Sequence, residues 1–130
     1  MEALQSPRDD LLHRRPVWQA LSSLFLDTDT SLDRAWRARL LAESPYTMEQ
    51  LQLILSDEVC PVCAFNLLSV AGVWSGFDIT WLEREILRGR KSPLRAWGRL
   101  GLPLITMHDS VEWTETKRLV LVNRSGQESA

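Results

Sequence analysis

VCPVCAFNLLSVAGVWSGF, residues 59–77, contains no charged side chain. A helix that is apolar on nearly every side is surrounded by other parts of the protein. Pro61 suits the first turn of a helix, because a backbone N–H has no partner there. We therefore expect a buried central helix over 61–74, with the rest of the chain packed around it.

Apolar residues at helical spacing precede this stretch and predict two helices. Pro16 indicates the start of a helix over 16–26, and Ser44 before Pro45 indicates the end of the second helix. The second helix has an apolar set and a basic set of side chains. We expect Leu32, Ala35, Trp36 and Leu40 on its inner face, and Arg34, Arg37 and Arg39 in water.

Capping signals predict the helices nearer the centre of the chain. Thr47 and Gln50 have the spacing of a capping box, which indicates a helix that runs to about Glu58. Asp78 is a suitable N-cap for another helix, and a short helix over 93–100 is predicted to follow.

Residues 103–122 carry mixed signals. Asp109 and Glu112 have capping spacing, whereas the β-branched residues of this segment favour strands. We expect a helix or a short extended segment here, and flexible ends at 1–9 and 123–130. The predicted fold class is α: a single domain over 1–130 with about six helices.

The chain is long enough to bury a core without a metal or a disulfide, since 45% of its 130 residues are hydrophobic. The side chains expected to be buried are Trp18, Leu21, Phe25, Trp36, Leu40, Leu51, Ile54, Leu55, Phe65, Leu68, Trp74, Leu82, Ile86 and Trp97.

The composition excludes several classes of protein. A net charge of −2 argues against a generally basic nucleic-acid-binding protein or a polybasic membrane protein. The first ten residues lack the apolar segment of a secretory signal, and residues 59–77 suit a core helix better than lipid. We expect a cytoplasmic protein.

Charge is unevenly distributed along the chain. No Lys or Arg occurs from Leu40 to Glu83, whereas residues 84–99 carry six basic residues and one Glu. These runs are either ordinary solvated helix faces, or they give the folded molecule one acidic side and one basic side. The candidate partner-binding residues are Glu43, Glu49, Asp57, Glu58, Asp78 and Glu83.

Cys60 and Cys63 have the spacing of a redox pair or of half a zinc site. A thioredoxin-type motif follows a strand, whereas a helix ending in acidic residues precedes this pair. Only His13 and His108 could add nitrogen ligands, and they are far apart in the sequence. Two buried cysteines in the core remain the alternative to a thiol switch, and the sequence predicts no metal or cofactor.

Asp27 and Asp29 follow an apolar run, as in the first motif of haloacid-dehalogenase-type phosphatases, which this segment resembles. That resemblance implies a nucleophilic Asp27, an acid–base Asp29 and a bound Mg²⁺. The preceding residues fit a helix rather than a strand, so the competing interpretation is a turn in which Asp side chains accept backbone hydrogen bonds.

Two further motifs carry less information. His108 and Asp109 precede Ser110, a combination that could serve nucleophilic catalysis. The sequence has no nucleophile elbow, which that catalysis needs. The basic run 84–99, with Trp81 and Trp97, has a weak likeness to a helix-turn-helix, which the overall acidity contradicts.

Three segments resemble a family of small bacterial proteins of unknown function: PVWQALSSLFLDTD (16–29), SPYTMEQLQLILSDEVCPV (44–62) and NLLSVAGVWSGFDITWL (66–82). The resemblance implies a bacterial cytoplasmic protein and supplies no catalytic residues. Together with the acidic middle of the chain, it leads us to expect a non-enzymatic protein-binding module, such as an immunity or antagonist protein. The alternatives are a Mg-dependent phosphatase and a thiol switch.

Overall fold

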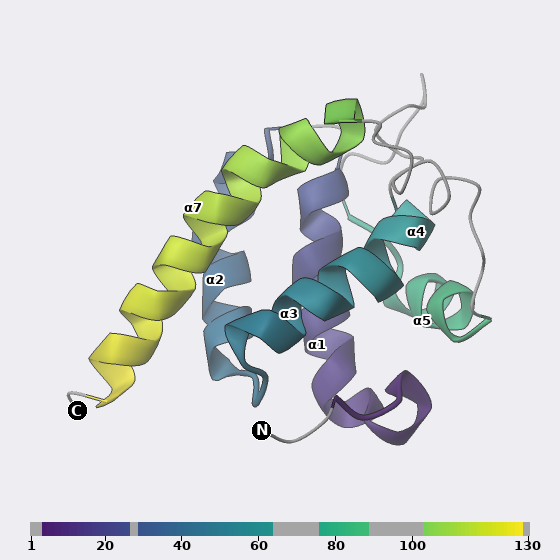
Figure 1. Ribbon diagram of the computed structural model, residues 1–130. Coiled ribbons are helices and arrows are strands. Elements are labelled where there is room, and N and C mark those ends of the chain that lie inside the picture. Colours follow the sequence, from purple (N-terminus) through teal and green to yellow (C-terminus); the bar gives the residue numbers. More distant parts are fainter. Residues whose placement is uncertain (1–3, 27–28, 64–75, 89–102, 129–130) are drawn as a thin grey trace.

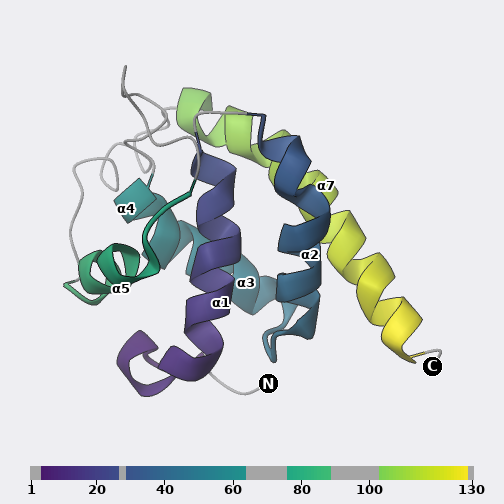
Figure 2. The same cartoon turned by 180° about the vertical axis from the view of Figure 1, so that it is seen from behind.

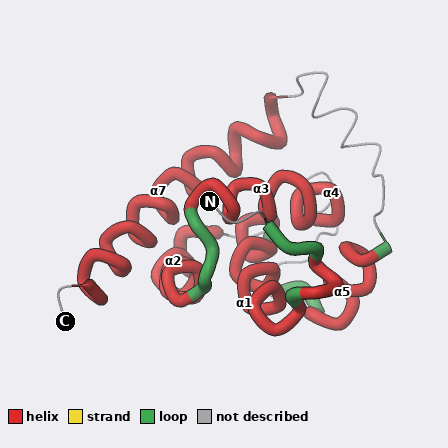
Figure 3. Tube along the Cα trace, turned by 60° about the horizontal axis from the view of Figure 1, so that its bottom comes forward, coloured by secondary structure: helices red, strands yellow, loops and turns green. Residues whose placement is uncertain are grey.

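The computed structural model describes residues 4–26, 29–63, 76–88 and 103–128, which form helices and no strand (Figures 1 and 3). The predicted α fold class is therefore confirmed. In chain order the elements are η1 (Pro7–Asp9), α1 (Leu11–Ser22), η2 (Ser23–Phe25), η3 (Thr30–Asp33), α2 (Arg34–Glu43), α3 (Met48–Ile54), η4 (Leu55–Val59), α4 (Cys60–Cys63), α5 (Ile79–Leu87) and α7 (Pro103–Glu128).

Helix α1 lies in the middle of the described residues, with α2 on one side and α5 on the other (Figures 1 and 2). Its Val17, Trp18 and Leu21 have no exposed surface and form the centre of the core. Of the predicted central helix over 61–74, the structure describes only the first residues, in α4. Residues 64–75 lie outside the described residues.

Helix α1 begins earlier than predicted. The expected start at Pro16 is wrong, because the helix begins at Leu11 and Pro16 lies inside it. The amide of Arg14 already donates to the carbonyl of Asp10 at 2.9 Å, which closes a first turn. Pro16 is exposed, and the helix continues although its nitrogen cannot donate a hydrogen bond.

Helix α2 turns a different face to the core than the sequence predicts. Arg37 has no exposed surface, whereas Leu32, just before α2, is 78% exposed and Ala35 is exposed. Trp36 and Leu40 are only half-buried. Ala38 and Leu41 are the apolar residues that α2 buries completely, and the arginine lies on their side of the helix. The cause is a set of hydrogen bonds that the Arg37 guanidinium donates, described below, which offsets the cost of burying its charge.

Helices α3 and α4 are joined through the π-helical turn η4 into one continuous rod (Figure 1). The predicted capping box at its start is confirmed, because Thr47 and Gln50 exchange side-chain to backbone hydrogen bonds. A π-turn holds one more residue than an α-turn, so η4 rotates the residues after it relative to those before it. Leu51, Ile54 and Leu55 face the core, as expected.

Helix α7 resolves the mixed signals of residues 103–122 as helix, and it continues to Glu128. It runs beside α2 and in the same direction (Figure 2), since Arg34 pairs with Glu112 near one end and Arg124 reaches Leu41 near the other. Arg124 lies in the segment that we expected to be flexible, and it is bonded to the end of α2.

The other predicted core residues divide into two groups. Eight of the predicted side chains are buried, and these are Trp18, Leu21, Phe25, Leu51, Ile54, Leu55, Leu82 and Ile86. Outside the described residues lie Phe65, Leu68, Trp74, Trp97 and the predicted helix over 93–100. Within the described part of the chain, no helix combines the length and the apolar character needed to cross a membrane.

Candidate interaction surface

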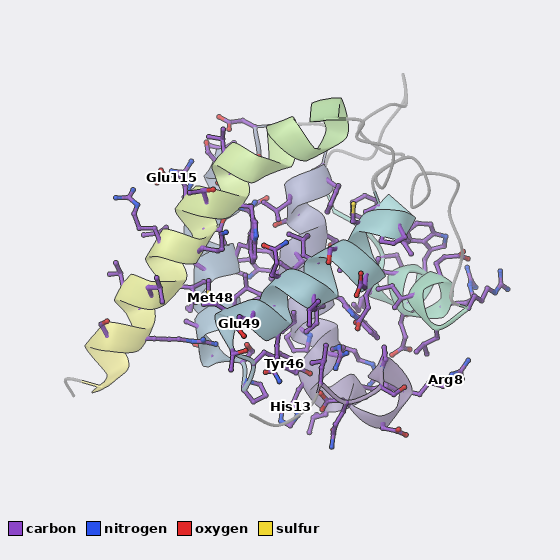
Figure 4. All side chains as sticks on the ribbon, in the orientation of Figure 1. Arg8, His13, Tyr46, Met48, Glu49 and Glu115 are labelled. Atoms are coloured by element: carbon purple, nitrogen blue, oxygen red, sulfur yellow. The ribbon has the colours of Figure 1, made fainter. Side chains whose placement is uncertain are left out.

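The outer face of the α3–η4 rod carries acidic and apolar side chains at the spacing of one helical turn. Glu49, Leu53 and Asp57 are all exposed, and Leu53 keeps 48% of its surface in water. Glu49 lies at the start of α3 (Figure 4). Since the sequence has no Lys or Arg from 40 to 83, this rod contributes no basic residue of its own to the face.

Glu58, which is next to Asp57 in sequence, points inward instead. Its carboxylate accepts two hydrogen bonds from Arg14, at 2.9 and 2.7 Å, and a third from the indole N–H of Trp18 at 2.8 Å. Arg14 is buried, with only 1% of its surface exposed. These bonds hold η4 against α1, so the Glu58 carboxylate stabilises the packing of the two elements.

A polar cluster continues from Arg14 to the loop before α3. The hydroxyl of Tyr46 donates to Asp10, His13 lies 3.0 Å from the same carboxylate, and Arg14 stacks over the Tyr46 ring (Figure 4 labels His13 and Tyr46). Burial alone would raise the pKa of Asp10, but the hydrogen bonds from Tyr46 and His13 hold it below its ordinary value. Burial, with the bond to Asp10, raises the pKa of Tyr46 to about 12.

The remaining predicted partner-binding residues lie on different elements. Glu83 accepts a hydrogen bond from Arg15 at 2.6 Å, which links α5 to α1. Asp78 is the N-cap of α5, as expected, and accepts from the amide of Thr80. Glu43 is exposed near the end of α2. Of the six candidate carboxylates, the structure places Glu49 and Asp57 together on one exposed helix face.

A second surface feature is an open cleft of about 540 Å³ between α2 and α7. The residues that line it are Ala35, Trp36, Arg39, Ala42, Glu43 and Asn123. Five of these belong to α2, so the cleft follows the outer face of that helix. Trp36 was expected in the core, and its half-buried ring is instead part of this wall.

An ionic network also joins α2 to α7. Glu112 accepts two hydrogen bonds from Arg34, both at 2.7 Å, and one from Arg37 at 3.2 Å. The bonds from Arg34 lower the pKa of Glu112, against the effect of burial. Burial lowers the pKa of the Arg37 guanidinium, although Glu112 opposes that shift.

The buried arginines were not predicted from the sequence, although one signal was present. Arg14 precedes Val17, Trp18 and Leu21 at the spacing of one helix face. Arg37 precedes the buried Leu41 by one helical turn. An arginine on the apolar face of a helix indicates a buried ion pair, because an unpaired guanidinium could not be buried there.

The predicted phosphatase motif is described only in part. Asp29 is an exposed N-cap of η3, whose carboxylate accepts hydrogen bonds from the amide and the hydroxyl of Ser31, at 3.0 and 2.6 Å. This is the role that the turn interpretation gives to an Asp. Asp27 lies outside the described residues.

The cysteine pair lies in α4, where Cys60 is half-buried and Cys63 is buried, and neither is in a disulfide. His108 and Asp109 lie in α7, and their side chains are outside the described residues. Among the side chains that the structure does place, no three His, Cys, Asp or Glu residues gather as metal ligands would.

Comparison with known proteins gives one match. Residues 12–119 match the model of a family described as a domain of unknown function (DUF7079). No curated protein and no solved structure matches the chain.

Proposed function

The chain belongs to the DUF7079 family, and we propose that it is a non-enzymatic protein-binding module that acts in the bacterial cytoplasm. Its binding surface is the outer face of α3 and η4, where Glu49, Leu53 and Asp57 are exposed one turn apart. This acidic and apolar row is the observation that carries the proposal. A partner that fits it is a basic protein, and a toxin neutralised by an immunity protein is one such case.

The chemistry of the row suits a charge-steered interaction. Carboxylates on the rim attract a basic partner and raise the association rate, while an exposed aliphatic side chain between them supplies apolar surface that becomes buried on binding. Helices often bind partners through side chains at this spacing. Leu53 is the apolar centre of the row, and Glu49 and Asp57 flank it.

Other carboxylates of the protein form ion pairs between helices. Glu58 and Glu112 are bonded to buried arginines, and Glu83 is bonded to Arg15. Each of these bonds connects two helices that are distant in the sequence. Glu49 and Asp57 are instead the exposed acidic side chains of the α3–η4 face, and Asp57 also accepts a hydrogen bond from the Ser56 hydroxyl.

A capture experiment with charge-reversed variants tests this proposal. The tagged full chain is used to capture proteins from a lysate of its own organism, and the affinity of the captured protein is then measured. We expect Glu49→Lys with Asp57→Lys to weaken binding at least about tenfold and to slow association, because like charges would face each other. Raising the salt concentration should weaken the wild-type complex.

The matched control is Asp9→Lys with Glu115→Lys. Both pairs of substitutions replace two carboxylates by two lysines, so they change the net charge equally. Asp9 is in η1 and Glu115 is in α7, so neither belongs to the α3–η4 row. Equal weakening by both pairs would show a general charge effect, and the absence of any stoichiometric partner would contradict the proposal.

A further inference from the structure

The outer face of η3 and α2 is a second exposed row, separate from the α3–η4 face. Leu32 is 78% exposed, and Ala35, Arg39 and Glu43 follow it at helical spacing, all exposed. Arg39 and Glu43 are one turn apart in the wall of the α2–α7 cleft. Within the described residues, neither forms an ion pair with another side chain.

This arrangement is complementary to itself. When two copies of one helix pack antiparallel about a two-fold axis, a residue on one side of the axis faces a residue on the other side. With the axis midway between Arg39 and Glu43, each Arg39 faces the Glu43 of the second copy. One interface then holds two opposite-charge contacts, although each copy contributes a single Arg and a single Glu.

We propose that this face of α2 is an interface through which two copies of the chain associate as a two-fold dimer. The occupant of the α2–α7 cleft is the α2 face of the second copy. Trp36 supplies the apolar anchor, since its half-buried ring lines the cleft beside Arg39. Trp and Arg are the residues most often found at the energetic centre of protein interfaces.

Further apolar surface is available around the charge pair. Leu32 precedes α2 in the same exposed row and is 78% exposed. A stable interface needs roughly 1,200 Å² of total buried surface, more than one pair of helix faces provides, so the edges of the cleft must contribute. The α3–η4 row belongs to another helix, so this proposal does not rest on the proposed function.

Charge exchange tests the proposal, with the mass of the full chain in solution as the readout. Sedimentation is measured from micromolar to millimolar concentration for the wild type, Arg39→Glu and Glu43→Arg. In each single variant both cross-axis contacts become repulsive, and we expect the dimer dissociation constant to rise at least roughly tenfold.

The two single variants mixed in equal amounts give the decisive measurement. In a mixed dimer, Glu at position 39 of one copy faces Arg at position 43 of the other, and the second contact keeps the wild-type pair. We expect the mixture to regain the wild-type association, and the double variant Arg39→Glu with Glu43→Arg to regain it too. An antiparallel dimer in which position 39 of one copy did not face position 43 of the other would not regain association in this way.

Arg118→Glu is the control, because it reverses an exposed arginine on α7 that pairs with Glu115. It should leave the dissociation constant unchanged, and circular dichroism verifies that every variant is folded. A monomeric wild type at all concentrations would overturn the proposal. So would single variants that associate as the wild type does, or a mixture that stays monomeric.

Discussion

At the scale of single residues, the most informative side chains are the buried arginines. Arg37 has no exposed surface, and its guanidinium donates to the Ser23 hydroxyl, the Glu112 carboxylate, the Thr116 hydroxyl and the Thr30 carbonyl. A buried charge is tolerated when its donors are satisfied in this way. Arg37 therefore connects η2, η3 and α7 to α2.

Replacing Arg37 should be costly for this reason. Arg37→Met keeps much of the volume but removes the donors, and it leaves the partly buried Glu112 with Arg34 alone. We expect the free energy of unfolding to fall by about 3–5 kcal/mol, as when one partner of a buried ion pair is removed. Urea denaturation measures the change.

The comparison variant is Arg118→Met, at a mostly exposed arginine of α7. It should change the unfolding free energy by less than about 1 kcal/mol, because exposed ion pairs contribute little. Similar losses in both variants would mean that the Arg37 network contributes no more than an exposed ion pair.

At the scale of elements, helix α7 is held to α2 by contacts along most of its described length. Trp113 is buried and donates to Gln52 at 2.6 Å, which fastens α7 to α3 as well. At the other end, Arg124 donates to the carbonyls of Leu41, Ala42, Ser44 and Tyr46. The last carbonyls of a helix have no partner within it, so α7 supplies the C-terminal cap of α2.

Removing this cap should loosen one end of the helix pair. For Arg124→Met we expect faster amide hydrogen exchange in the last turn of α2 and in the part of α7 after Val120. The free energy of unfolding should fall by about 1–3 kcal/mol, since several carbonyls lose a charged donor.

The position of the faster exchange separates a local cap from a general loss of stability. Arg124 makes none of these bonds to α1. Hydrogen exchange of the α1 amides should therefore change only as far as the global stability changes. If exchange in the last turn of α2 stayed at its wild-type rate, Arg124 would not act as a cap.

At the scale of the whole molecule, the two buried networks make the stability of the fold depend on pH. The pKa values of Asp10 and Glu112 are both lowered in the folded protein. A group with a lowered folded-state pKa stabilises the fold above its unfolded-state pKa and loses that contribution as pH falls through the folded value. Both groups therefore act in the same direction: each stabilises the fold at neutral pH and loses that contribution as the pH falls.

We expect the free energy of unfolding to decrease as pH is lowered through the carboxylate range, from about 4.5 downward. Glu112→Gln should be less stable than the wild type at neutral pH and should lose less stability on acidification, because one linked carboxylate is gone. Urea denaturation at a series of pH values tests this.

Glu115→Gln is the matched control, one turn along α7 and paired with the exposed Arg118. Its pH dependence should follow that of the wild type. A parallel loss of slope in both variants would mean that the acid sensitivity does not come from the network at Glu112.

The sequence by itself determined the local structure of the protein. Apolar spacing, the Thr47 and Gln50 capping box, the Asp78 N-cap and the Ser44–Pro45 stop act within a turn or two of the chain. For this reason the helical class and several helix ends could be predicted. The start of α1 could not, because interactions of its first turn outweighed the Pro16 signal.

Tertiary structure alone decided which face of α2 is buried and which carboxylates remain on the surface. Arg14 meets Glu58 across 44 residues of sequence, and Arg37 meets Thr116 across 79. Such partners are brought together only by packing, and local periodicity does not reveal them. The predicted group of six acidic residues was therefore divided by the fold: Glu58 and Glu83 pair with arginines, while Glu49 and Asp57 share an exposed face.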